Sequence, residues 1–172
     1  AIDSTIRVKP LTAYVWDSFP ELSDFGYEKR EGLLFVGGFA HPPNLDAVLW
    51  FLKEVFPEIR AEESVNFYVA GSKVPEELKA LHNPENGIHI LGFVSDERLR
   101  ELYENCRLVV VPLRYGAGVK GKVIEALHEG AAVLTTSCGA EGIEKAEEVM
   151  VIEDDPRKFA DQAVLLYQNL PA

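Results

Sequence analysis

The pattern of hydrophobic and polar residues predicts a regular series of strands and helices from Leu33 onward. Short runs that are almost entirely apolar are typical of strands buried on both faces of a sheet. We expect six such strands, at residues 33–36, 65–70, 88–91, 108–111, 132–135 and 149–152. Several of these runs stop at a glycine, which favours a tight turn directly after the strand.

Between the strands, apolar residues recur every three or four positions, which is the period of a helix with one buried face. Helices are expected at residues 44–56, 75–81, 96–103, 119–129 and 156–168. Asn44 and Ser95 are predicted to cap two of them, and Gly130 is predicted to end the fourth. The alternation of strands and helices predicts an α/β fold with a doubly wound, Rossmann-like parallel sheet covered by helices on both faces.

Residues 1–31 lack a sustained period and are predicted to be a linker, or lead-in, from a missing N-terminal domain. One domain is then expected over residues 32–172. The aromatic residues of the lead-in are expected to pack onto that domain; they are Tyr14, Trp16, Phe19, Phe25 and Tyr27. Because the chain begins with Ala1 rather than Met, we expect it to be a piece of a longer protein.

The composition narrows the choice of partners. Lys and Arg number 17 against 28 Asp and Glu, a net charge of -11, which argues against nucleic acid or an anionic membrane as the main partner. No membrane-spanning run or signal peptide is readable, so a cytoplasmic protein is expected, with membrane association only through other parts of the full-length protein. Cys106 and Cys138 are predicted to be reduced thiols, and the dispersed histidines indicate neither a metal site nor a cofactor.

One basic segment contrasts with this acidic background. Residues 105–124 contain no Asp or Glu but four cations, namely Arg107, Arg114, Lys120 and Lys122. The segment runs from the strand at 108–111 through a glycine-rich turn into the next helix. Backbone N–H groups at a helix N-terminus attract anions, and glycines let a phosphate approach closely. A phosphate site is therefore predicted here, with a glycine turn and solvated lysines as the alternative.

Four segments of the chain strongly resemble one protein family. They are Phe35–Gly38, Pro43–Ala47, Leu91–Asp96 and Lys122–Ala126, and the most specific stretch is Glu125-Ala126-Leu127-x-x-Gly130-x-x-Val133. The chain is similar over residues 33–168 to the C-terminal, donor-binding domain of retaining group 1 nucleotide-sugar glycosyltransferases. Those enzymes pair two Rossmann-like domains in the GT-B architecture, so this chain would be one half.

The resemblance implies a donor site for a nucleoside diphosphate sugar. The loop Gly118–Lys120 would hold the diphosphate, Glu125 would accept hydrogen bonds from the ribose, and Phe93 and Val94 would meet the base. The full set of expected donor-binding residues is Gly38, Phe93, Val94, Arg114, Gly118, Val119, Lys120, Lys122 and Glu125. It also implies metal-independent transfer with retention, in polysaccharide biosynthesis, to a glycan or lipid acceptor held by the missing N-terminal domain, which would supply most catalytic residues.

Two departures from the family pattern keep other functions open. Ala117 stands where the family usually has a second Glu, and residues 37–45 offer His41 but no Lys or Arg. A degenerate, non-catalytic scaffold domain and a sugar-nucleotide epimerase of the same architecture are the alternatives. A nicotinamide dehydrogenase would share the sheet, but the first strand is not followed by G-x-G-x-x-G.

Overall fold

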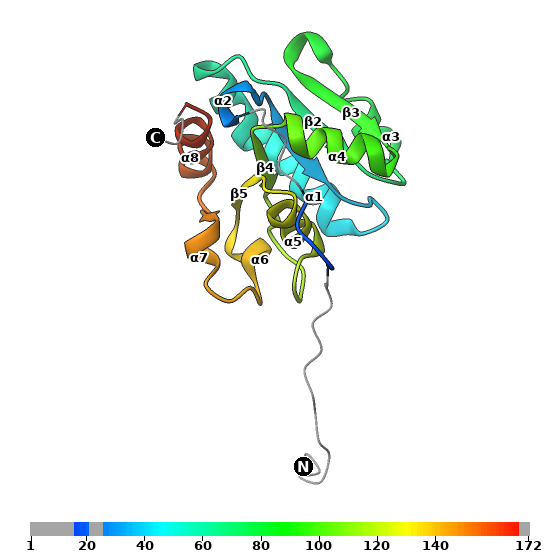
Figure 1. The fold of residues 1–172 in the computed structure, drawn as a ribbon. Coiled ribbons are helices and arrows are strands. Elements are labelled where there is room, and N and C mark those ends of the chain that lie inside the picture. Colours follow the sequence, from blue (N-terminus) through cyan, green and yellow to red (C-terminus); the bar gives the residue numbers. More distant parts are fainter. Residues whose placement is uncertain (1–15, 21–25, 169–172) are drawn as a thin grey trace, which may run out of the picture.

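The computed structural model describes residues 16–20 and 26–168, and these form a six-stranded parallel sheet with helices on both faces (Figure 1). The strand order is β3-β2-β1-β4-β5-β6. The strands are β1 (Leu33–Val36), β2 (Phe67–Ala70), β3 (Ile88–Gly92), β4 (Leu108–Val111), β5 (Ala132–Thr135) and β6 (Val151–Ile152). The doubly wound, Rossmann-like fold class expected from the sequence is confirmed, and the order of the strands reverses between β1 and β4.

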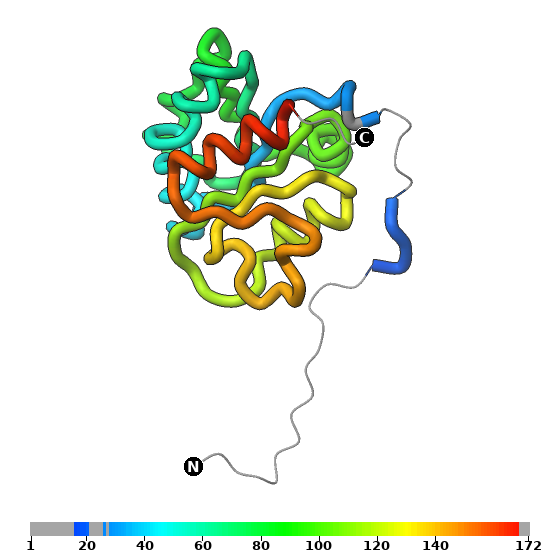
Figure 2. The backbone as a smooth tube through the Cα atoms, turned by 90° about the vertical axis from the view of Figure 1, so that its left-hand side faces the viewer, coloured from blue at the N-terminus to red at the C-terminus, as the bar shows by residue number. Residues whose placement is uncertain are grey.

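Right-handed crossovers place the helices in two layers. The helices are α1 (Pro42–Trp50), α2 (Phe56–Glu62), α3 (Glu76–Lys79), α4 (Asp96–Asn105), α5 (Gly121–His128), α6 (Ser137–Ala140), α7 (Ala146–Val149) and α8 (Pro156–Gln168). The crossovers that contain α1 and α3 lie on one face of the sheet, and those that contain α4 and α5 lie on the other. Helix α8 returns to the first face and packs beside α2 (Figure 2). No helix among the described residues is long and apolar enough to cross a membrane.

The first helix differs from its prediction at both ends. It begins at Pro42 rather than at Asn44, because prolines fit the first helical positions, where an N–H group is not needed. It also continues beyond residue 56, through a π-helical segment (Phe51–Val55) and then α2, to Glu62. The wider turn precedes Pro57, which has no N–H group to bond to the preceding turn. Pro57 therefore lies at the start of α2 instead of ending the helix.

Other differences are confined to short elements. The strand expected at 149–152 is divided: α7 ends at Val149, and β6 contains only two residues. The helix expected at 119–129 begins at Gly121, after a loop that keeps residues 119 and 120 outside it. The helix expected at 75–81 is four residues long, and α6 was not predicted.

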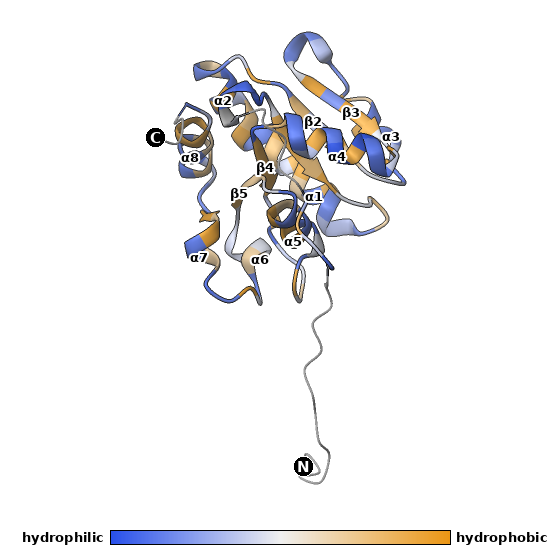
Figure 3. Ribbon diagram, in the orientation of Figure 1, coloured by the Kyte–Doolittle hydropathy of each residue, from blue (hydrophilic) through white to orange (hydrophobic). Residues whose placement is uncertain are grey.

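The core is formed by the apolar strands, much of whose ribbon is orange in Figure 3, and by aromatic side chains packed on them. Phe51 lies between two partners, with ring centroids 4.7 Å from Phe67 of β2 and 6.2 Å from Phe159 of α8. Phe51, Phe67 and Phe159 are completely buried. This contact fastens α8 to the sheet, because aromatic pairs contribute beyond the apolar area that they bury.

Part of the lead-in packs onto α5. The Trp16 ring stacks on the His128 ring at 4.2 Å, and His128 Nε2 lies 3.1 Å from the carbonyl oxygen of Ser18. Phe19 is 5.6 Å from the same imidazole but remains largely exposed. The expected packing is therefore found for Trp16, while Tyr14 and Phe25 lie outside the described residues.

The outer edge of β3 is covered by the segment that precedes it. Asn83 and Ile88 exchange two backbone hydrogen bonds of 2.9 Å, in an antiparallel bridge. The N–H of Ile90 donates to His82 Nδ1 at 3.1 Å. Both outward backbone groups of Ile88 and the N–H of Ile90 thus have partners within their own chain.

Candidate functional site

The candidate site lies where β1 and β4 end, because doubly wound sheets bind ligands at the reversal of strand order. The loop after β1 leads into α1, and the loop after β4 leads into α5. His41 and Lys120 are the N-cap residues of these helices, and neither gives a side-chain hydrogen bond to its helix. By contrast, Ser95 caps α4, as predicted, and Thr136 caps α6. The start of α5 therefore presents backbone N–H groups that no described side chain caps.

Two hollows lie at the end of the sheet where the strands finish. The first, of about 210 Å³, is enclosed by the starts of α1 and α5 and includes Val119, Lys120 and Lys122. The second, also about 210 Å³, lies over the ends of β1, β2 and β3 and includes Gly38, Phe93 and Val94. Six of the nine expected donor-binding residues therefore line these two hollows.

Lys122 crosses between the two layers of helices. Its ammonium donates a hydrogen bond to Asn44 Oδ1 of α1 and lies 4.4 Å from the centroid of the Phe35 ring. A Cβ atom on Gly37 would be 2.7 Å from Lys122 Nζ, so the missing side chain at Gly37 makes room for the cation. Gly37 lines the second hollow and Lys122 lines the first, which places this junction between the two.

The charge of Lys122 is sensitive to pH. Burial lowers the pKa of the Lys122 ammonium to about 7, and nearby Lys120 acts in the same direction, while Glu125 opposes both. An anion bound at the start of α5 would add a negative charge beside the ammonium and would favour its protonated form. The residue is thus suited to hold a phosphate near neutral pH.

Lys120 closes the glycine loop on itself. Its ammonium donates to the carbonyl oxygen of Gly118 and lies 3.0 Å from Glu141 Oε2. Gly118 has φ +78°, and beyond its two chain neighbours no described atom lies within 4 Å of the place where its Cβ would be. The backbone at Gly118 is therefore open to an approaching group. Sequence reasoning missed Glu141, which comes from a segment with no recognisable pattern.

Glu125 lies on α5, one turn beyond Lys122, and lines neither hollow. Burial raises the pKa of the Glu125 carboxyl, whereas the Lys122 charge lowers it and Glu129 raises it. Phe93, the residue expected to meet a base, is 80% exposed after β3. Its ring is therefore free to stack on a planar group.

Arg114 does not join these residues. Its guanidinium holds Asp46 of α1 through two hydrogen bonds, of which the one from Nε is 2.9 Å, and it lies 5.9 Å from the Trp50 ring. Arg114, Asp46 and Trp50 line a third hollow, on the outer side of α1. The structure thus separates Arg114 from the other cations of the expected site.

Replacing Arg114 with alanine is accordingly expected to change the affinity for a nucleoside diphosphate by less than about threefold, because Asp46 holds the guanidinium outside the two hollows. Isothermal titration calorimetry would measure this change, with Lys122→Ala as the comparison. A tenfold loss of affinity in Arg114→Ala would show that the guanidinium leaves Asp46 to contact the nucleotide.

Asn44 was predicted as a helix cap, and this interpretation is wrong. Asn44 lies in the first turn of α1, where its Nδ2 donates to the carbonyl oxygen of Gly38 at 2.8 Å and its Oδ1 accepts from Lys122. Its position directly after Pro42 and Pro43 was the available signal, but a proline pair marks a helix start rather than a side-chain direction.

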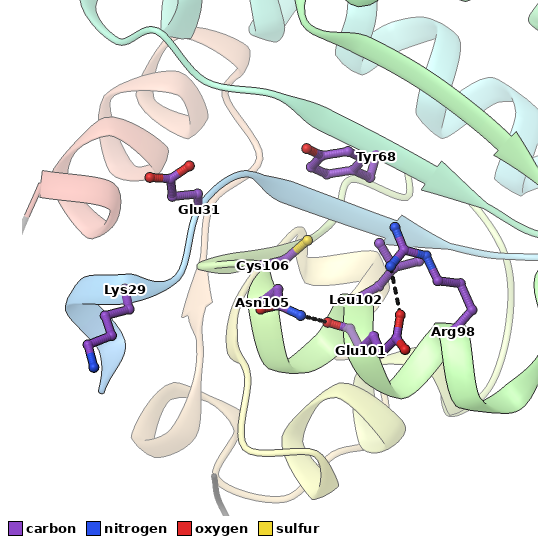
Figure 4. Close-up of a pocket in the computed structure, with 8 residues that line it drawn as sticks. All are labelled: Lys29, Glu31, Tyr68, Arg98, Glu101, Leu102, Asn105 and Cys106. Carbon is purple, nitrogen blue, oxygen red and sulfur yellow. Dashed lines mark hydrogen bonds and ion pairs between the residues drawn. The ribbon is translucent and has the colours of Figure 1, made fainter. Parts of the chain in front are cut away.

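A larger hollow, of about 300 Å³, lies between α4 and the start of β1 (Figure 4). Arg98 pairs with Glu101 at 2.7 Å, and Asn105 Nδ2 donates to the backbone of Glu101 (Figure 4). Burial raises the pKa of the Cys106 thiol to about 12, so that this group is no thiolate nucleophile. The hollow borders the beginnings of the strands, where doubly wound sheets do not bind their ligands, and we do not assign it.

Comparisons with known proteins associate this chain with one family and one fold. The sequence model of the family described as "Glycosyl transferases group 1" matches residues 30–169. A 44.6 kDa protein in the cps region of Klebsiella pneumoniae is 31% identical over 162 residues. That match covers 88% of this chain and 42% of the relative, so the chain spans less than half of the relative's length.

Solved structures share the fold. S. aureus TarM, in a complex that contains UDP, superposes with a TM-score of 0.64 at 17% identity, over 88% of this chain and 31% of TarM. The pneumococcal O-GlcNAc transferase GtfA, in complex with UDP and GlcNAc, superposes with a TM-score of 0.61 at 17% identity, over 88% of this chain and 31% of GtfA. WaaG, a glycosyltransferase involved in lipopolysaccharide biosynthesis, gives 0.59 at 20% identity, over 83% of this chain and 39% of WaaG.

Proposed function

Since the chain belongs to the group 1 glycosyltransferase family, we propose that it binds the nucleoside diphosphate sugar donor at the ends of β1 and β4. The observation that carries the proposal is the junction at Lys122, where a largely buried cation meets the uncapped start of α5. Helix N–H groups and a cation in a partly dry site are the partners that a diphosphate requires. The TarM and GtfA complexes contain UDP, which makes UDP the first nucleotide to test.

Each part of the donor has a place in this proposal. The diphosphate lies in the first hollow, against the Gly118 backbone and the ammonium groups of Lys120 and Lys122. The ribose reaches Glu125, and the base lies in the second hollow near Phe93 and Val94. Helix dipole and lysine charges offset the charge of the departing diphosphate, so we propose transfer without a metal ion. Retention at the anomeric carbon and a glycan or lipid acceptor belong to the same proposal and require the rest of the protein.

Calorimetry with UDP, GDP, dTDP, ADP and NADH tests the proposal directly. One nucleoside diphosphate is expected to bind. Glu125→Gln is expected to lower the affinity for that nucleotide and for its free nucleoside alike, by roughly tenfold, because both carry the ribose. Thermal melting of the variant would control for folding. Binding of NADH alone would indicate a dehydrogenase, and binding of none of the five would favour the scaffold alternative suggested by Ala117.

A further inference from the structure

We infer that Asn44 is a positioning residue that holds the Lys122 ammonium at the start of α5 without neutralising it. This inference rests on the proposed donor site. It assigns a role in phosphate binding to a residue of α1, although the phosphate is expected on the other face of the sheet, at α5. Asn44 itself need not touch the donor.

The orientation of the Asn44 amide is fixed by its two partners. The carbonyl oxygen of Gly38 can only accept, so the Nδ2 end must face it, at 2.8 Å. The Lys122 ammonium can only donate, so the Oδ1 end must face Lys122. Asn44 is 6% exposed, which leaves the amide little freedom to turn away. One side chain thus joins α1, the loop after β1 and α5.

An amide suits this position because it is neutral. Among the described residues, Lys122 forms no ion pair within 4.0 Å, and its ammonium also lies close to the Phe35 ring and to Gly37. The charged or titratable groups around it are Glu125 and Lys120, which act on it electrostatically, and His41 and Tyr115, which line the same hollow. A carboxylate at position 44 would satisfy the ammonium and repel a phosphate. Asparagine orients the cation and leaves its charge available.

A double-mutant cycle tests this role, with UDP as the probe. Asn44→Leu keeps a buried side chain of similar size but removes both hydrogen bonds. We expect this variant to bind UDP roughly tenfold more weakly and to bind uridine as the parent does. Because Asn44 acts through Lys122, the variant Asn44→Leu/Lys122→Ala is expected to bind UDP as Lys122→Ala does. Asn66→Leu is the matched control. The Asn66 amide also forms a hydrogen bond, to His89, but Asn66 lies just before the start of β2, away from the strand ends where the proposed site lies.

A second measurement needs no nucleotide. Heteronuclear NMR of the lysine side chains would follow the pKa of Lys122, which we expect to fall in Asn44→Leu and to rise in Asn44→Asp. Additive losses in the cycle, or a pKa of Lys122 that neither variant changes, would overturn the inference. If the parent protein binds no nucleoside diphosphate, the proposed function fails, and the NMR titration still decides whether Asn44 controls the ammonium.

Discussion

Replacing Lys122 with methionine is expected to make the protein more stable while it weakens UDP binding roughly ten- to hundred-fold. The ammonium is largely buried, and burial lowers its pKa to about 7, so the folded protein carries an unfavourable charge at this position. Replacing a buried charge with an apolar side chain of similar length often stabilises a protein. The gain is reduced because Asn44 Oδ1 loses its partner. We therefore expect about 1 kcal/mol, or a melting temperature higher by about 2–4 °C.

The pH dependence of stability tests whether the buried charge of Lys122 causes the expected gain in Lys122→Met. The pKa of Lys122 is about 7 in the folded chain, whereas a lysine in an unfolded chain has a pKa of 10.5. Between these two pH values the unfolded chain therefore binds more protons than the folded chain. The contribution of this residue to stability must then rise as the pH rises from 7 towards 10.5. Across that window, the melting temperature of the parent should therefore rise relative to that of Lys122→Met. Lys79→Met, at an exposed lysine paired with Glu76, is the control that should change neither stability nor binding.

Binding of UDP should show the opposite dependence. Above pH 7 the free Lys122 loses its proton, so the affinity of the parent is expected to fall by up to about tenfold per pH unit. Lys122→Met should lack this decline. If the variant is less stable than the parent at pH 7 and binds UDP equally well, both the burial argument and the site assignment are wrong.

Replacing Gly71 with alanine is expected to lower the free energy of unfolding by about 3 kcal/mol or more. The new Cβ would lie 1.8 Å from the carbonyl oxygen of Gly37 and 2.7 Å from its carbonyl carbon. Neither atom can turn away, because both belong to the backbone, so the loops after β1 and β2 must separate. Urea unfolding would measure the loss. UDP binding should fall as well, since Gly37 borders Lys122.

Gly118→Ala is the matched control for this effect. Gly118 also has a positive φ, +78°, but the space around it is open among the described atoms. Its substitution should therefore cost only the strain of a left-handed alanine, about 1 kcal/mol. Equal losses of stability in the two variants would show that backbone conformation, rather than the contact with Gly37, explains Gly71.

The sequence was sufficient for the elements whose pattern is strong. The strands at 33–36, 108–111 and 132–135 lie at the predicted residues, because each is a short run, apolar except for Thr135, of the kind typical of buried strands. The helix at 156–168 is also as predicted. The lengths of the weaker elements depended on tertiary contacts. Pro57, for example, indicates a helix end locally, yet the π-helical turn before it lets the chain continue.

The candidate site was predictable in outline but not in its pairings. Glycines and lysines between β4 and α5 indicated an anion site, and the structure brings Lys120 and Lys122 to one hollow. The partner of Arg114 is 68 residues away and that of Lys122 is 78 residues away. A local pattern cannot reveal such pairs. For the same reason Asn44 was interpreted as a cap, since both roles need a short polar side chain near a helix start.

The covered edge of β3 restricts how this domain can associate with other chains. Because Asn83 already bonds both outward groups of Ile88 and His82 accepts from the N–H of Ile90, an incoming strand would find no continuous row of open hydrogen-bonding positions there. The opposite edge, β6, offers only two residues. Sheet extension, the usual route to edge-to-edge aggregation, is therefore disfavoured on both sides. Among the described residues, the helices and loops are therefore the favoured places for neighbouring domains and subunits to bind.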